Sequence, residues 1–327
     1  MEKFNPIEYH HTRDFSRKMN ATFEFIRQNF KSLGKSILLI AGPPLIVASL
    51  IIATFMNEFL AMTKAAASSG GDSEAFQTYV MSVNFWLQVV LMFLLFLLSS
   101  IMSIATVNNY IILYEEKQSN NIDVSEVWNR VRETFWMYFG TTFIFFLLVV
   151  PLTFVLAVPI GLLAAVSPAL IFLGMMAMFG TFIYLAISVS LTYIVRAYEK
   201  KGFFDSIARS FRLVRDKWWS TFGLIFVLYI VMMTISYIFM IPWYVVTAAS
   251  ALHSTSTEML DQSTMAWSTI ILFTLYYLAQ MVLGALPNIG IAFQYFNLVE
   301  MKEAKGLLGR IDTLGQSQPQ STSDEQY

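Results

Sequence analysis

Few residues of this 327-residue chain have the types and spacing that catalysis or metal binding requires. There is no cysteine to act as a nucleophile or a thiolate ligand. The three histidines, His10, His11 and His253, lie in polar stretches; a metal role for the adjacent pair is open, but we favour solvent-exposed side chains. The chain contains no HExxH, glycine-rich phosphate loop or nucleophile elbow. The sequence therefore predicts no catalytic residue, no metal site and no cofactor.

The remaining catalytic candidates are carboxylates in two polar loops: Asp72, Glu74, Glu258 and Asp261. We interpret them as solvated loop charges. None of the apolar runs contains an ionisable residue, and such residues at membrane depth usually mark proton relays and ion-coupled sites. This pattern argues against a proton-coupled pump and favours a protein without enzymatic activity. It leaves open a facilitator, or an ion site built from carbonyl groups.

The most functional-looking pattern is an arginine that recurs at the start of three apolar runs. The arginines are Arg27, Arg132 and Arg215, and a glycine follows each at a similar distance, at Gly34, Gly140 and Gly223. Cations beside an apolar stripe attract anionic lipid headgroups by about 1 kcal/mol per charge. We predict headgroup anchors at Arg27, Arg132, Arg215, Lys217 and Trp218. The alternative is that these charges only set the topology.

Polar residues within the apolar runs form a second candidate site. Three of them directly precede a tyrosine, namely Asn109, Thr192 and Gln294, and Asn288 follows Pro287. Broken helices line the substrate site of some transporters, so a polar path between helices near Pro287 is one hypothesis. Membrane helices also tolerate proline for structural reasons. We favour structural hydrogen bonding between helices.

The elements that position these residues are membrane spans. The chain is 56% hydrophobic and 13% charged, whereas about a quarter of a soluble domain is charged. Apolar runs long enough to cross a ~30 Å hydrocarbon core lie near 36–56, 85–114, 139–164, 169–195, 221–246 and 267–296. We therefore predict an all-α, polytopic transmembrane helical bundle of six spans.

Two stretches with helical periodicity precede spans. In the first, Phe15, Met19, Phe23, Ile26 and Phe30 recur at steps of three and four. It predicts a helix that either lies in the headgroup region, with Lys18 and other cations snorkelling outward, or packs on protein. The second stretch, 202–230, predicts a basic amphipathic helix that continues without a break into a span.

The charge distribution predicts the orientation. Every Lys and Arg except Lys64 lies in the N-terminal segment, in the two connectors after the second and fourth spans, or in the tail. Loops rich in Lys and Arg stay in the cytoplasm, so we expect a bacterial inner-membrane protein with both termini cytoplasmic. Membrane lipids and possibly another membrane protein are the expected partners, and nucleic acid is not.

The three arginine–glycine pairs described above and three tyrosine–lysine pairs predict a threefold repeat. Tyr110, Tyr193 and Tyr295 are each followed seven residues later by a lysine. Together with the arginine–glycine pairs, they define units near 15–117, 122–201 and 203–305. Each unit consists of an interfacial helix and two spans. We expect one membrane domain over 1–315 and a disordered tail over 316–327.

Two segments carry a family resemblance. SFRLVRDKWWSTFGLIF and YFNLVEMKEAKG resemble the membrane-domain group of the glycerophosphoryl diester phosphodiesterases and related bacterial proteins of unknown function. The resemblance implies a membrane fold. It carries over no catalytic residue, because no segment outside the spans is long enough for the hydrolase domain that names the family.

Together these patterns favour a non-enzymatic membrane scaffold or accessory subunit that binds lipid or another membrane protein through its interfacial helices. The alternative is a transporter or channel for a small solute, with a polar path near Pro287. An enclosed water-accessible path favours the second, and a solid core with exposed grooves favours the first.

Overall fold

The computed structural model describes residues 6–68, 73–164, 167–253 and 262–304, together with Gly306 and Leu308. All regular structure in this part is helical, which confirms the all-α prediction. In chain order the elements are α1 (Phe15–Ile40), α2 (Gly42–Ser68), α3 (Ser73–Val80), α4 (Val83–Lys117), α5 (Val124–Ala164), α6 (Pro168–Val189), α7 (Thr192–Glu199), α8 (Phe203–Val214), the 3-10 helix η1 (Arg215–Lys217), α9 (Trp218–His253), α10 (Gln262–Leu283) and α11 (Ala285–Glu303).

Six helical segments are long and apolar enough to cross a bilayer, so the protein is a multi-pass membrane protein. They are Gly42–Phe59, Val83–Lys117, Val124–Leu163, Ala169–Glu199, Phe203–Ala249 and Ala266–Glu303. Long apolar helices satisfy their own backbone hydrogen bonds, which is what the hydrocarbon interior demands. The first begins at Gly42 instead of near residue 36, because the helix breaks at Ala41 before Pro43 and Pro44.

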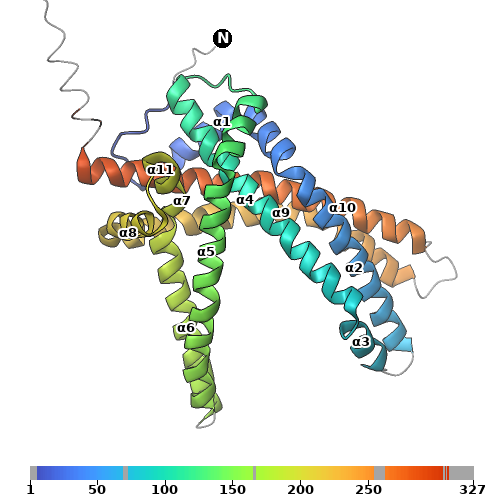
Figure 1. Cartoon of the computed structure of the whole chain (residues 1–327). Coiled ribbons are helices and arrows are strands. Elements are labelled where there is room, and N and C mark those ends of the chain that lie inside the picture. Colours follow the sequence, from blue (N-terminus) through green and yellow to red (C-terminus); the bar gives the residue numbers. More distant parts are fainter. Residues whose placement is uncertain are drawn as a thin grey trace, which may run out of the picture.

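The spans form three helical hairpins that project from a common base (Figure 1). They are α2 with α4, α5 with α6, and α9 with α10. Helix α10 also packs on α2, so the first and third hairpins form one slab. The α5–α6 hairpin projects in a different direction (Figure 1), and the most apolar window of each of its spans has almost no residue buried inside the protein.

The base, which we call the hub, is where α1, α4, α7, α8 and α11 meet. Its core is aromatic. The rings of Tyr9 and Phe296 stack at 4.7 Å, and Phe25 meets Tyr114 edge-on at 5.0 Å. Such ring pairs contribute about 0.5–1.5 kcal/mol each beyond the area they bury. The hub therefore supplies the tertiary packing from which the hairpins extend.

Helix α1 turns the phenylalanines of its apolar stripe away from the hub, whereas Met19 and Ile26 of the same stripe are partly buried. Phe15, Phe23 and Phe30 are 42–62% exposed. The face that packs against α4 and α11 instead carries Phe25 among polar residues, including Lys18. An apolar face toward lipid and a polar face toward protein is the arrangement that a membrane environment favours, since lipid offers no hydrogen bonds.

The predicted unbroken helix over 202–230 is interrupted. Between α8 and α9 the backbone tightens into η1, whose residues are all exposed. Lys302 of α11 lies across this turn, donating to the Arg212 carbonyl at 2.5 Å and to Asp216 Oδ2 at 2.8 Å. These contacts tie η1 to the hub and separate the hub helix α8 from the span α9.

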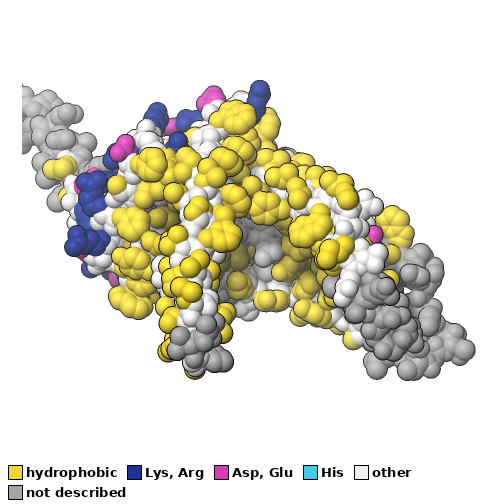
Figure 2. All heavy atoms as spheres, turned by 60° about the horizontal axis from the view of Figure 1, so that its bottom comes forward, with side chains coloured by type: hydrophobic (Ala, Val, Ile, Leu, Met, Phe, Trp, Pro, Cys, Tyr) yellow, Lys and Arg dark blue, Asp and Glu magenta, His cyan; other side chains and the backbone are white. Residues whose placement is uncertain are grey.

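Charge divides the molecule in the same way. Lys and Arg side chains gather along one edge, whereas the hairpins are covered with hydrophobic side chains (Figure 2).

The three repeated glycines do not mark close packing: a Cβ at Gly34 or Gly140 would meet nothing within 4 Å, and one at Gly223 only Phe15 at 3.8 Å. The threefold repeat remains a prediction, and the tail over 316–327 lies outside the described residues.

Candidate functional site

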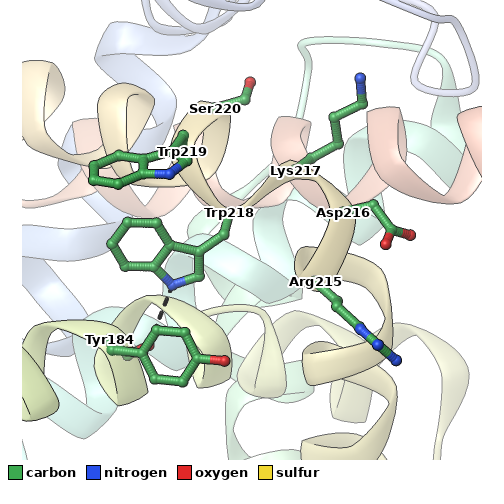
Figure 3. Close-up of a pocket in the computed structure, with 7 residues that line it drawn as sticks. All are labelled: Tyr184, Arg215, Asp216, Lys217, Trp218, Trp219 and Ser220. Carbon is green, nitrogen blue, oxygen red and sulfur yellow. Dashed lines mark hydrogen bonds between the residues drawn. The ribbon is translucent and has the colours of Figure 1, made fainter.

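A cavity of about 550 Å³ lies where η1 passes into α9 (Figure 3). It is lined by Tyr184, Arg215, Asp216, Lys217, Trp218, Trp219 and Ser220. Three of the predicted headgroup anchors, Arg215, Lys217 and Trp218, thus share one site. We call this the η1 pocket. It sits at the boundary between the charged hub and an apolar span.

Aromatic stacking builds the wall of the η1 pocket. The Trp218 indole stacks on the Tyr184 ring with centroids 5.8 Å apart, and its Nε1 donates to the Tyr184 carbonyl at 3.4 Å (Figure 3). On its own helix, Trp218 stacks on Phe222 at 5.4 Å. Trp219 projects outward and is 78% exposed. Amphipathic indole rings of this kind favour the headgroup level of a bilayer.

The charges of the η1 pocket are predominantly positive. Its one carboxylate, Asp216, is paired with Lys302 at 2.8 Å. Arg215 and Lys217 are exposed, and neither forms an ion pair with a described residue. Their side chains point away from each other in Figure 3. An anion bound here would therefore draw two long, mobile side chains together.

A third cation lies behind the pocket wall. Lys18 was predicted to snorkel outward, but it is 2% exposed, and its Nζ donates to Ser220 Oγ at 3.0 Å and to Gln294 Oε1 at 2.7 Å. Burial, together with the charge of Lys217, lowers the pKa of Lys18 from 10.5 to about 8. Of the two alternatives for this stretch, outward snorkelling is wrong for Lys18, because the polar face of α1 faces the hub.

The other two predicted anchors lie elsewhere. On α1, Arg27 forms two hydrogen bonds to Glu24, with its Nε at 2.9 Å and its Nη2 at 3.0 Å. These hydrogen bonds lower the pKa of the Glu24 carboxyl. Arg132 is exposed on α5. The five predicted anchors thus lie on four elements, α1, α5, η1 and α9, and only the η1 pocket gathers several of them.

The four predicted path residues do not share one described cavity. Gln294 and Thr192 are fully buried, and Gln294 donates to Thr221 Oγ1 at 2.8 Å. Asn109 donates to the Ala105 carbonyl and to Thr134 Oγ1, and lines a cavity between α4, α5 and α7. Asn288 donates to the Gly284 carbonyl and lines a different cavity of about 430 Å³.

A buried ionic cluster in the hub was missed by the sequence reasoning. Glu199 accepts from Arg209 Nε at 3.1 Å and from Tyr295 Oη at 2.8 Å. Arg209 also pairs with Glu303. The cluster joins α7, α8 and α11. The glutamate before each repeated lysine was visible in the sequence, but its partner Arg209, on α8, was not.

The histidines are placed differently from one another. His10 is half-buried in the hub, where its Nε2 lies 3.2 Å from Tyr198 Oη and 3.6 Å from Glu115 Oε1, whereas His11 is exposed. The side chain of His253 lies outside the described residues. Within the described residues no three His, Asp or Glu side chains form a group able to hold a metal ion. His10 thus acts as a hub contact.

Comparisons with protein-family models, with curated proteins and with solved structures found no match to this chain.

Proposed function

We propose that the protein is a membrane scaffold or accessory subunit whose hub faces the bacterial cytoplasm and which binds anionic phospholipid at the η1 pocket. The observation that supports this is the meeting of Arg215 and Lys217 with the indoles of Trp218 and Trp219 at the start of a span. A guanidinium and an ammonium complement a lipid phosphate, and the indoles lie against glycerol and upper acyl carbons.

The scaffold role rests on the three hairpins. The outward face of the α5–α6 hairpin carries large exposed apolar residues, including Phe154, Phe172 and Phe179. A hairpin that packs on the rest of the protein only near its base leaves most of its surface for lipid or for the span of another protein. This surface projects in a different direction from the slab of α2, α4, α9 and α10 (Figure 1). The resemblance to the phosphodiesterase membrane-domain group agrees with a membrane role without catalysis.

The test is native mass spectrometry of the protein extracted gently from its own membrane. A scaffold is expected to carry another protein in fixed stoichiometry, in addition to anionic lipid. Complexes that persist in the wild type and dissociate when Phe172 and Phe179 are changed to Ala would assign the α5–α6 hairpin as the partner surface. Recovery of the chain alone, with neither protein nor lipid, would contradict the proposal.

Transport is a second candidate, favoured by the cavity at the α10–α11 break. Asn288, Gln280 and Ser103 line it, and Gly284 and Pro287 mark the interruption of the helix. Broken helices expose backbone groups that bind solutes in transporters. Uptake of a small solute into proteoliposomes, lost with Asn288→Ala and Gln280→Ala, would establish transport. If sealed proteoliposomes that contain the wild-type protein take up no solute, transport is contradicted and the scaffold role is retained.

A further inference from the structure

A second charged cavity lies beside the hub helices α4 and α7. It measures about 730 Å³ and is bounded by α4, α5 and α7. Its lining carries both signs of charge, from Glu116, Arg130, Glu133, Arg196 and Lys200 among others. None of its residues lines the η1 pocket. We call it the α5–α7 pocket.

Arg196 is the group in this pocket that most needs a ligand. Its Nη1 donates to Thr141 Oγ1 at 2.6 Å and reaches the Met137 carbonyl at 3.4 Å, and its guanidinium lies over the Phe203 ring at 5.9 Å. Its Nε is buried without an acceptor. No carboxylate of the described residues lies within ion-pair distance of it. A partly buried cation without a counter-ion is costly unless an anion completes the site.

The other charges of the pocket can be sorted by whether a partner already holds them. Arg130 is paired with Glu116, and Lys201 with Glu199 at 2.6 Å. Glu133 and Lys200 are exposed, and neither forms an ion pair within the described part of the chain. Glu115, which also lines the pocket, accepts from Tyr198 Oη at 3.0 Å and lies 3.6 Å from His10 Nε2. Two cations, Arg196 and Lys200, and the Glu133 carboxylate thus remain for a ligand.

The pocket lies where helices change from charged to apolar. On α5, Glu133 is followed closely by Trp136, which is 73% exposed, and by the exposed Phe139. Ile112 and Met137 line the pocket on the apolar side. An exposed indole marks the headgroup level of a membrane. A ligand here would meet charged groups at one end and hydrocarbon at the other.

We propose that the α5–α7 pocket binds an ammonium–phosphate group of the ethanolamine-phosphate class. The phosphate oxygens accept hydrogen bonds from the Arg196 guanidinium and Lys200 Nζ, and the ammonium donates to the Glu133 carboxylate. Two cations beside one carboxylate favour this group over a phosphate with an uncharged alcohol, which would leave Glu133 unsatisfied. The group comes from a lipid headgroup or from a free phosphate ester. The proposal does not depend on the η1 pocket.

Native mass spectrometry of the purified full-length chain tests the lipid source. The protein is equilibrated with mixed micelles holding equal amounts of an ethanolamine phospholipid and a glycerol phospholipid. We expect the wild type to retain the ethanolamine lipid preferentially. Glu133→Gln should reduce that preference about tenfold, because one charge-assisted contact is worth about 1.4 kcal/mol. Arg196→Gln should weaken retention of both lipids at this pocket.

Two controls make the outcome decisive. Lys31→Gln, at an exposed position of α1 that lines neither pocket, should leave the ethanolamine preference unchanged. Calorimetry with free phosphoethanolamine separates the two sources: binding as tight as that of the lipid assigns a soluble ester, and no binding assigns the lipid headgroup. The proposal is overturned if Glu133→Gln, folded as judged by circular dichroism, keeps the full preference, or if the wild type has none and does not bind the free ester.

Discussion

Lys18 Nζ lies 2.7 Å from Gln294 Oε1, and this hydrogen bond joins α1 to α11. Gln294 donates in turn to Thr221 Oγ1 at 2.8 Å, which brings α9 into the same network. The lysine is buried, so its charge is held in the hub at a desolvation cost. The hub is therefore sensitive to the protonation of one amine.

Stability should rise with pH above about 8. The pKa of Lys18 is about 8 in the folded protein and 10.5 as its ordinary value. Below pH 8 both states hold the proton, and the buried charge destabilises the fold. Between the two values the unfolded chain binds more protons, so each pH unit adds up to about 1.4 kcal/mol to the free energy of unfolding. Thermal unfolding in detergent from pH 7 to 10 measures this slope.

Variants at two lysines of α1 isolate this contribution. Lys18→Met removes the titrating group and should flatten the rise relative to the wild type. Lys31→Met, at an exposed position of the same helix, should keep the wild-type slope. A wild-type slope in the Lys18→Met protein would show that other groups cause the pH dependence.

Removing the Glu199 carboxylate, whose side chain is 10% exposed, should destabilise the hub. Glu199→Gln leaves Arg209 with Glu303 alone, and we expect a loss of about 2 kcal/mol, since hydrogen bonds to buried charges are among the stronger ones. The matched control is Glu24→Gln, which breaks the exposed pair with Arg27 and should change stability by less than about 1 kcal/mol. Chemical denaturation in mixed micelles compares the two, and equal losses would contradict a packed hub.

Two glycines should respond in opposite ways to alanine. A Cβ at Gly290 would lie 2.1 Å from Leu228 Cδ1, and Leu228 is fully buried between α9 and α11. Overpacking there should cost about 1–3 kcal/mol. Gly140→Ala meets nothing within 4 Å and should be neutral or stabilising by up to about 1 kcal/mol, as alanine favours the helix. Apparent melting temperatures report both, and a tolerated Gly290→Ala would show that α11 is not held closely against α9.

Cysteine labelling tests the orientation. The chain has no native cysteine, so Met81→Cys and Asn121→Cys each introduce one thiol. Met81 is 82% exposed between α3 and α4, and Asn121 is exposed in the connector between α4 and α5. In intact spheroplasts an impermeant maleimide should label position 81 and not position 121. The reverse pattern would place the hub outside the cytoplasm.

The sequence was a good guide to the spans and a poor one to the hub. Long apolar runs predict spanning helices because the bilayer imposes their length and composition locally. The turn at Ser167 and Pro168, for example, is where α6 begins, capped by the Ser167 side chain. Such boundaries depend on neighbouring residues alone.

The hub depends on residues that are far apart in the chain. The stripe of Phe15, Phe23 and Phe30 has the same period whether it faces lipid or protein, so periodicity did not reveal that the polar face of α1 is buried. The break at η1 depends on Lys302, which is 86 residues from Asp216 in sequence. The pairing of Glu199 with Arg209 likewise required knowledge of how α7 turns into α8.

The central claim is that the η1 pocket binds anionic phospholipid. The most direct test is to measure, by native mass spectrometry, how much anionic lipid the protein retains after gentle extraction. The account predicts that the wild type holds anionic phospholipid, that the double variant Arg215→Gln with Lys217→Gln loses most of it, and that a second double variant, Lys31→Gln with Lys35→Gln, retains it. Equal retention in all three proteins would contradict a headgroup site at the η1 pocket.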